Sequence, residues 1–368
     1  MTRSSERLEP RPGAPLTMKE VAEAAGVAMS SVSRVLSGHP DVSRNMHARV
    51  MAAVEELRYR PNLLAQSLRS QQTFTVGFLV GDISNPLLAE IVKGAVTTLR
   101  EGSYATILTD SERDPDLDAA HLGLFEQRRV DGLLLSPASE NHPPTLEALA
   151  RTRVPVVLID RDLPPPVVAD RVLSDHRTGV NQALNHLIEL GHRRIGLIVG
   201  LPVRATAERK AAFEATFKEC GLEPTYLIFE SHDLSAESGE RGALVLLDDP
   251  DPPTAILVGG NQLVLGALTA IRTRGLRIPE DISIVTTDDT AVTALHTPPI
   301  ATVSRDNVEL GVVAAEFLLE RMREYARRLE RGADAALDPV PRETTLPTHF
   351  VARASCGPVA TKSSASVT

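Results

Sequence analysis

The chain has 368 residues, of which 42% are hydrophobic and 24% are charged, a composition typical of a soluble globular protein with two or three domains. It has no apolar run of the ~20 residues that span a bilayer, no apolar signal-peptide region near its start, and only two cysteines, too few for a disulfide framework or a metal-ligand set. We therefore expect a cytoplasmic protein without cofactor or metal, and the net charge of −9 taken alone argues against nucleic-acid binding.

The charge is unevenly distributed along the chain. Residues 1–72 hold ten Lys and Arg against seven Asp and Glu, so they carry +3 and the remainder carries −12, which is −9 minus +3. A basic end on an acidic body is what DNA binding by one end would look like, although a solvated surface explains so small an excess equally well. Residues 1–15 are rich in Pro, Arg and Glu, and we expect them to form a disordered tail.

The next segment, residues 16–60, predicts three short helices. The spacing of Thr17 and Glu20 is that of a capping box, and it precedes an apolar stripe at the spacing of one helical face. Gly26 then supplies the backbone freedom that a sharp turn between two helices often needs. The stripe consists of Val21, Ala24 and Ala25, and the other two helices are expected from Ala28 to Leu36 and from a cap at Ser43 to Leu57.

Three short helices with a glycine turn between the first two make a helix-turn-helix, whose second helix enters the DNA major groove. The polar side chains of that second helix would face bases or phosphates, and Arg34 could make the bidentate guanine contact worth about 1–3 kcal/mol of discrimination. A small helical bundle with a solvated polar face has the same spacing, so spacing alone leaves both interpretations open. The exposed candidates are Met29, Ser30, Ser33 and Arg34.

The residues themselves favour the DNA-binding interpretation. Residues 17–70 resemble the head of the LacI family of bacterial regulators, and the match is residue for residue in Val32-Ser-Arg-Val-Leu36 and in Tyr59-Arg-Pro-Asn62. Ala28 departs from the family, which usually places a Ser there as helix cap, and a lost cap costs about 0.5–2 kcal/mol. The DNA-binding residues that the resemblance implies are Thr17, Met29, Ser30, Ser33, Arg34, Asn62, Ala65 and Leu68.

Residues 61–72 are expected to form a hinge helix and linker. Pro61 suits a first helical turn, and Leu64, Ala65 and Leu68 form one apolar stripe. Isolated helices below ~12–15 residues are marginal in water, so this one would fold when it pairs with its symmetry mate on DNA. The resemblance implies that paired hinge helices lie in the minor groove, where Leu68 wedges a base step. An ordinary linker helix is the alternative.

From residue 73 onward, strand and helix patterns alternate, which predicts parallel sheets with helices on both faces. Eight or more such units exceed one comfortable sheet, so two sheets with a ligand cleft at their strand carboxyl ends fit better. The predicted fold is α/β: an all-α helix-turn-helix head with a hinge helix, then a two-lobed, periplasmic-binding-protein-like core of parallel sheets over residues 73–351. Within it we expect a final edge strand at Thr344–Val351 and a charged helix at 316–330, followed by a disordered tail over 352–368.

The resemblance continues to about Leu319 and implies an effector site in the cleft. An arginine and two carboxylates suit a polyol or another polar ligand, and a sugar is the family default. The alternatives to a ligand-binding role are a surface position for Arg209 and a helix cap for Asp288. For Asp160, a structural role fits as well as a ligand-binding role. The implied site consists of Leu87 and Leu88 in the first lobe, the polar strand-end residues Asp160, Arg209, Asn261 and Asp288, and Leu234 and Asn307, whose positions are often aromatic.

Several departures from the family bear on the identity of the effector. The chain has no Trp and only 3% aromatic residues, so the ring platforms that stack on sugars are missing. His176 stands where Asn often follows Asp175, and Gln262 stands where Asp is common. A more aliphatic or differently charged effector therefore stays open. The positions that lack an aromatic ring are Leu88, Leu234, Thr287 and Asn307.

We interpret the chain as a ligand-responsive repressor that binds a near-palindromic double-stranded operator as a homodimer, with a tetramer as the alternative assembly and no membrane partner. A periplasmic-type solute-binding protein shares the two-lobed core but would need a signal peptide and would lack the head. An enzyme is not expected, because the sequence contains no nucleophile elbow, P-loop, dinucleotide fingerprint or zinc-protease motif.

Overall fold

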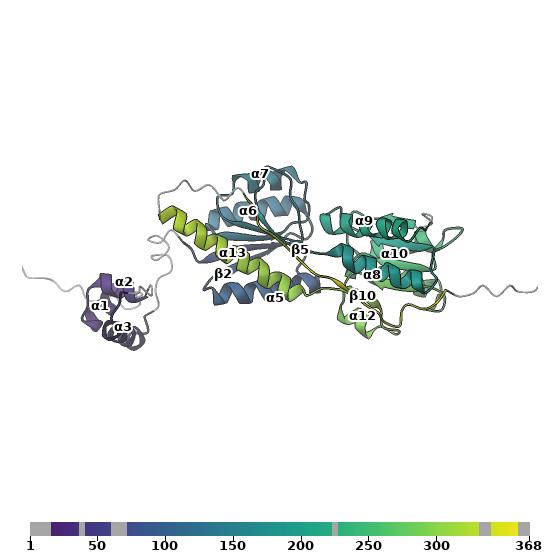
Figure 1. The fold of residues 1–368 in the computed structure, drawn as a ribbon. Helices are drawn as coiled ribbons and strands as arrows, with labels where there is room; N and C mark the ends of the chain where they lie inside the picture. Colours follow the sequence, from purple (N-terminus) through teal and green to yellow (C-terminus); the bar gives the residue numbers. More distant parts are fainter. Residues whose placement is uncertain (1–15, 37–40, 60–71, 223–226, 331–339, 360–368) are drawn as a thin grey trace, which may run out of the picture. The chain divides into compact units, whose positions relative to one another are not determined.

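The computed structural model divides the chain into two compact units, residues 1–73 and 74–368, which are described separately (Figure 1). None of the helices in the part of the chain described is long and apolar enough to cross a membrane. The structure describes residues 16–36, 41–59, 72–222, 227–330 and 340–359.

The first unit contains the three predicted helices, α1 (Met18–Ala25), α2 (Met29–Leu36) and α3 (Arg44–Glu56). The capping box at the start of α1 is present, and Gly26 adopts a φ of 61° in the left-handed region at its end. Each helix places apolar side chains in one small core. That core includes Val21, Ala22, Ala25, Val32, Val35, Val50, Ala53 and Tyr59.

One residue of the predicted α1 stripe is wrong: Ala24 is exposed, whereas Ala22 is buried. At about 100° per residue the buried arc runs from Val21 over Ala25 to Ala22, which leaves Ala24 outside it. The turn after α1 is held from the third helix, because Arg49 Nη2 donates to the carbonyls of Ala25 and Gly26 over 2.7 and 2.9 Å. These two hydrogen bonds fix α3 against the α1–α2 turn.

The second unit has two lobes, each built on a six-stranded sheet. The sheet of the first lobe has the order β11-β5-β4-β3-β1-β2, and all its pairs are parallel. The strands are β1 (Thr75–Val80), β2 (Ala105–Asp110), β3 (Gly132–Ser136), β4 (Val156–Ile159), β5 (Asp170–Ser174) and β11 (Glu343–Leu346). The helices of this lobe are α5 (Pro86–Glu101), α6 (Pro115–Arg128), α7 (Pro143–Arg151) and α13 (Asn307–Glu330).

The sheet of the second lobe has the order β12-β10-β9-β8-β6-β7, and it is parallel except for the antiparallel pair of β10 with β12. Its strands are β6 (Ile195–Val199), β7 (Leu227–Glu230), β8 (Ala255–Val258), β9 (Ser283–Thr286), β10 (Ala301–Ser304) and β12 (His349–Val351). Its helices are α8 (His176–Glu189), α9 (Arg204–Glu219), α10 (Ala236–Leu247), α11 (Asn261–Thr273) and α12 (Ala291–Leu295). The predicted two-lobed α/β core is confirmed.

The chain passes between the lobes three times, from β5 to α8, from β10 to α13 and from β11 to β12. The single edge strand predicted for residues 344–351 is therefore wrong, since the segment forms one strand in each sheet. Pro347 lies between the two strands and has no N–H with which to continue a ladder. Two of the passages touch, because Asp175 N–H donates to Leu346 O over 2.9 Å.

The charged segment 316–330 forms the end of α13, so it extends the last core helix. The prediction of a disordered tail from residue 352 is wrong for residues 352–359, which pack on the second lobe. Ser355 is fully buried and its hydroxyl accepts from Ala301 N–H over 2.8 Å, while Arg353 pairs with Asp289 over 2.7 Å. Because these contacts are polar, they produce no amphipathic pattern from which the sequence could have predicted an ordered segment.

Candidate functional site

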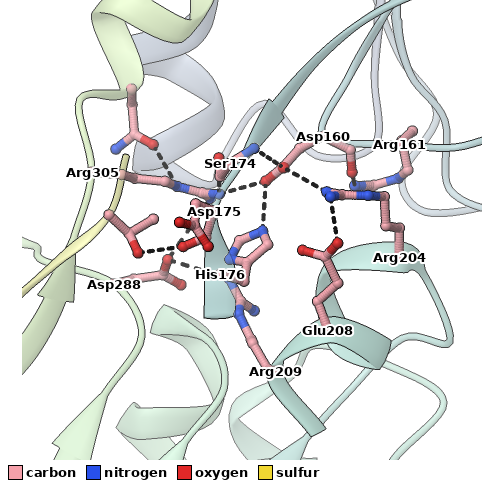
Figure 2. Close-up of polar contacts among 12 residues, drawn as sticks. Asp160, Arg161, Ser174, Asp175, His176, Arg204, Glu208, Arg209, Asp288 and Arg305 are labelled. Carbon is pink, nitrogen blue, oxygen red and sulfur yellow. Dashed lines mark hydrogen bonds and ion pairs between the residues drawn. The ribbon is translucent and has the colours of Figure 1, made fainter. Parts of the chain in front are cut away.

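Seven of the eight predicted effector residues line one cavity between the two lobes of the second unit. Most of them lie at or just after the carboxyl ends of strands, where open parallel sheets place their ligand sites. The cavity has a volume of about 100 Å³, and Figure 2 shows some of its polar residues, namely Asp160, Arg161, Arg209, Asp288 and Arg305. The seven are Leu87, Leu88, Asp160, Arg209, Leu234, Asn261 and Asp288.

The eighth predicted residue, Asn307, lies outside this lining. It begins α13 and is buried, and its amide donates to Glu90 Oε2 over 3.0 Å while its carbonyl accepts from Arg305 Nε over 3.0 Å. Asn307 therefore orients Arg305, which does line the cavity.

Asp160 follows β4 and is 6% exposed. Its φ of 53° is in the left-handed region, an uncommon conformation that persists where surrounding contacts enforce it. Oδ1 accepts from Ser174 N–H over 2.9 Å, and Oδ2 accepts from His176 and from Arg305. Burial raises the pKa of Asp160, but His176, Arg305 and these hydrogen bonds outweigh it and hold the pKa well below its ordinary value.

His176 begins α8 and is 3% exposed. Burial lowers its pKa to about 4 even though Asp160 attracts the charged ring, and Arg209 and Arg305 lower it further by repulsion. The ring is therefore neutral near pH 7, with its Nε2 proton directed at Asp160. The negative charge of Asp160 is thus balanced by Arg305 rather than by the histidine.

Arg209 on α9 is 7% exposed and lies against the end of β8 and the loop after β9. Its Nη1 donates to Gly259 O over 3.0 Å, and its Nη2 is 4.0 Å from Asp288 Oδ1. Arg209 Nε and Asp288 Oδ1 are both buried without a hydrogen-bond partner. Burial lowers the pKa of Arg209, and the Asp288 charge partly restores it. The prediction of Arg209 as a cleft residue rather than a surface residue agrees with this burial.

Three arginines in the lining were missed by sequence reasoning, namely Arg113, Arg161 and Arg305. Two of them could have been found from the sequence, because each lies just after the carboxyl end of a strand, where parallel sheets place their ligand sites. Arg161 follows Asp160 at the end of β4, and Arg305 follows β10. Arg113 carried none, since it lies in the loop between β2 and α6 with a φ of 63°.

Direct hydrogen bonds join the lobes across the mouth of the cavity. Asn261 Nδ2 donates to Asn85 Oδ1 over 3.0 Å, and Gln262 Nε2 donates to Asp82 Oδ2 over 3.0 Å. Arg113 donates to both Asp82 and Gln262. An amide at position 262 can serve as donor and acceptor at once, which a carboxylate at the same place could not do beside Asp82.

In the first unit the predicted DNA-reading residues of α2 face outward. Met29, Ser30 and Arg34 are exposed and Ser33 is half-buried, while Val32 and Val35 face the core. Thr17 is exposed at the start of α1. Three further predicted residues, Asn62, Ala65 and Leu68, lie with the predicted hinge helix outside the described residues.

Within the ranges that the structure describes, no group of three or more His, Cys, Asp or Glu side chains is placed to hold a metal ion. His192 is buried and hydrogen-bonded to Thr254, Ser283 and Gly357 O. It joins the end segment to the second lobe and has no place in the cleft.

Comparison with known proteins connects both units to one family. The family model described as "Bacterial regulatory proteins, lacI family" matches residues 17–62, and the model described as "Periplasmic binding protein-like domain" matches residues 184–356. The chain is 33% identical over 317 residues to the ribose operon repressor of Escherichia coli (strain K12), covering 86% of this chain and 96% of that one. It is also 33% identical over 318 residues to the HTH-type transcriptional repressor PurR of Aliivibrio salmonicida, covering 85% and 95%.

A solved structure extends this likeness to the whole fold. The lac repressor dimer bound to operator and the anti-inducer ONPF superimposes with a TM-score of 0.75 at 27% identity, covering 93% of this chain and 99% of that one.

Proposed function

The chain belongs to the LacI family of bacterial regulatory proteins and is a ligand-responsive, DNA-binding transcriptional repressor. We propose a separate role for each of its two units. The first unit reads the operator, and the cleft of the second unit holds the effector. The observation that carries the proposal is the outward-facing row Met29, Ser30 and Arg34 on a helix that turns Val32 and Val35 toward the core.

The operator-reading role is assigned to α2. Arg34 supplies the guanidinium for a bidentate guanine contact, and Met29 and Ser30 meet neighbouring base edges. Thr17 and Ser33 contact phosphates, and such contacts position the helix without reading sequence. For the hinge we propose Asn62, Ala65 and Leu68 as minor-groove residues, with Leu68 as the wedge.

We assign a homodimer as the active assembly, because a near-palindromic operator presents two equivalent half-sites to a two-fold symmetric protein. A relative solved on its operator is a dimer. A tetramer is the alternative assembly. The DNA partner places the protein in the cytoplasm, and no catalytic reaction is assigned to it, since its relatives are named as regulators.

The effector is a sugar or a related polar metabolite held between the lobes. One relative is named for the ribose operon, and the cavity combines apolar walls with polar strand-end groups. The contacts are proposed from Leu87, Leu88, Asp160, Arg209, Leu234, Asn261 and Asp288, with Asn307 acting through Arg305.

Ligand binding would change the angle between the lobes and therefore the point where the hinge leaves the second unit. Operator and effector affinities are then coupled reciprocally, typically by about 1–3 kcal/mol. The test is fluorescence anisotropy with palindromic duplexes from upstream of neighbouring genes. The full chain should bind them specifically, and a chain lacking residues 1–70 should not; equal affinity of the two would refute the proposal.

A further inference from the structure

We propose that the effector is a small polyhydroxylated anion, in which an oxyanion group such as a carboxylate or phosphate is carried on a hydroxylated carbon chain. This rests on the proposed function, because it takes the interlobe cavity as the effector site. It goes further by assigning a charge to the effector, which a neutral sugar lacks.

The cavity lining has an excess of positive charge. Four guanidinium groups face three carboxylates there, which leaves one positive charge over. Arg161 is also attracted by two carboxylates outside the lining, Glu140 and Asp118. Both already accept backbone N–H groups, Glu140 those of Asp162 and Arg204 and Asp118 that of Ala138. The lining residues counted are Arg113, Arg161, Arg209 and Arg305 against Asp82, Asp160 and Asp288.

The pairing of these groups shows which arginines carry the excess. Arg113 is bonded to Asp82, and Arg305 is bonded to Asp160. Arg161 donates to two carbonyl oxygens, those of Pro137 and Asp160, over 2.8 and 3.0 Å, and among the described residues it forms no ion pair.

Arg209 is only loosely paired, because its carboxylate partner Asp288 also lies 3.9 Å from Arg305. Its hydrogen bond goes to the Gly259 carbonyl, its Nε has no partner, and Asp288 approaches no closer than 4.0 Å. Burial lowers the pKa of both arginines, and Arg161 lowers that of Arg209 further by repulsion. A buried charge is costly unless it is paired, so an anion in the cavity that both groups line would be favoured. A carboxylate or phosphate matches the planar fork of a guanidinium.

A second buried atom without a hydrogen-bond partner, Asp288 Oδ1, favours a hydroxyl group on the ligand. Asp288 is 5% exposed, its Oδ2 accepts from Asn261 N–H over 2.9 Å, and its Oδ1 is buried without a hydrogen-bond donor. An anionic ligand group would be repelled there, whereas a hydroxyl can donate to it. The two sites together specify a ligand with an oxyanion and at least one hydroxyl.

The rest of the lining is consistent with recognition by charge rather than by stacking. Leu87, Leu88 and Leu234 form the apolar walls, and no aromatic residue of the described chain lines the cavity. The cavity of about 100 Å³ is small beside the roughly 300–1,000 Å³ of common ligand sites, which favours a short carbon chain.

Isothermal titration of the full-length chain with ligands matched in carbon skeleton tests this inference. The three-carbon set is glycerol, glycerate and glycerol 3-phosphate, and the five-carbon set is ribose, ribonate and ribose 5-phosphate. We expect at least one anion to bind at least tenfold more tightly than its neutral counterpart. The carboxylate and phosphate members identify which oxyanion is preferred, and the two sets identify the chain length.

Arg209→Gln and Arg161→Gln should each weaken anion binding at least tenfold and weaken binding of the neutral counterpart by a smaller factor, so that the preference for the anion falls. The matched control is Arg151→Gln on α7, which removes the same charge from an exposed ion pair with Glu147 and should leave all affinities unchanged. The wild-type comparison needs no variant, so a misfolded arginine variant would not obscure the result.

A neutral member that binds as tightly as its anions, or the failure of every anion to bind at millimolar concentration, would overturn the inference. Operator binding is measured on the same samples, so that a failure of this inference can be distinguished from a failure of the proposed function. Specific operator binding with no anion preference would leave the repressor assignment standing and refute the charge of the effector alone.

Discussion

The ring of His176 donates a hydrogen bond from Nε2 to Asp160 Oδ2 over 3.1 Å, at the edge of the cavity between the lobes. The ring faces three charged groups, since Arg209 and Arg305 act on it together with Asp160. Because burial and both guanidinium groups disfavour its protonation, the pKa falls to about 4, and the ring serves as a neutral donor to a charged carboxylate.

This depressed pKa predicts a loss of stability in mild acid. An unfolded histidine titrates near 6.5, so its contribution is fully present above pH 6.5 and is lost as the pH falls toward about 4, by about 3 kcal/mol in all. His176→Asn removes the titrating ring. The difference in free energy of unfolding between wild type and variant should therefore shrink or reverse between pH 7 and pH 4 in denaturant titrations. A difference that is constant over this range would contradict the account.

A double-mutant cycle tests the buried pair of Asp160 and Arg305. Arg305→Gln leaves the Asp160 carboxylate without its permanent positive partner and should destabilise the second unit by about 3–5 kcal/mol. Adding Asp160→Asn removes the stranded charge and should restore most of that loss. Chemical denaturation of the full chain measures both. Additive effects of the two substitutions would mean that the side chains do not interact as drawn in Figure 2.

Two glycines should respond to alanine in opposite directions. A Cβ at Gly94 on α5 would lie 2.1 Å from Val308 O, so α5 and α13 must separate, and Gly94→Ala should cost about 1–3 kcal/mol. Gly123 on α6 has no atom within 4 Å of such a Cβ, and Gly123→Ala should stabilise the helix by up to about 1 kcal/mol. Thermal unfolding of the two variants gives the comparison. Equal shifts would contradict the close approach of α5 and α13.

Arg34→Ala should weaken specific operator binding by about 1–3 kcal/mol, because it removes a bidentate base contact. Binding to unrelated duplex should fall much less, since that depends on phosphate contacts. The side chain is exposed on α2, so folding should be unaffected. Anisotropy titrations at one fixed salt concentration measure both affinities, with Arg151→Ala as the control for loss of one positive charge. Equal losses on both duplexes would place Arg34 on the phosphate backbone instead.

Much of this architecture could be predicted because its signals are local. Thr17, Glu20 and Gly26 mark the ends of one helix, and buried runs such as Val76–Val80 mark parallel strands. The cleft residues Asp160 and Asp288 were predicted from the family resemblance, and they lie one residue after β4 and two residues after β9.

The remaining features depend on contacts between distant parts of the chain. Arg113 meets Gln262 across 149 positions, and no pattern near either residue indicates the other. The end segment escaped prediction because Ser355 and Gly357 hold it through hydrogen bonds to the second lobe, which leave no apolar period in the sequence. Both features depend on pairing between residues far apart in the sequence rather than on local conformational preference.

The central claim is that this chain reads a symmetric DNA site with α2, and selection from a random duplex library by the full-length protein tests it most directly. The account predicts enrichment of one inverted repeat with two equivalent half-sites, and loss of that enrichment in the Arg34→Ala variant. Recovery of no common sequence, of a single asymmetric site, or of the same repeat by Arg34→Ala with undiminished enrichment would contradict it.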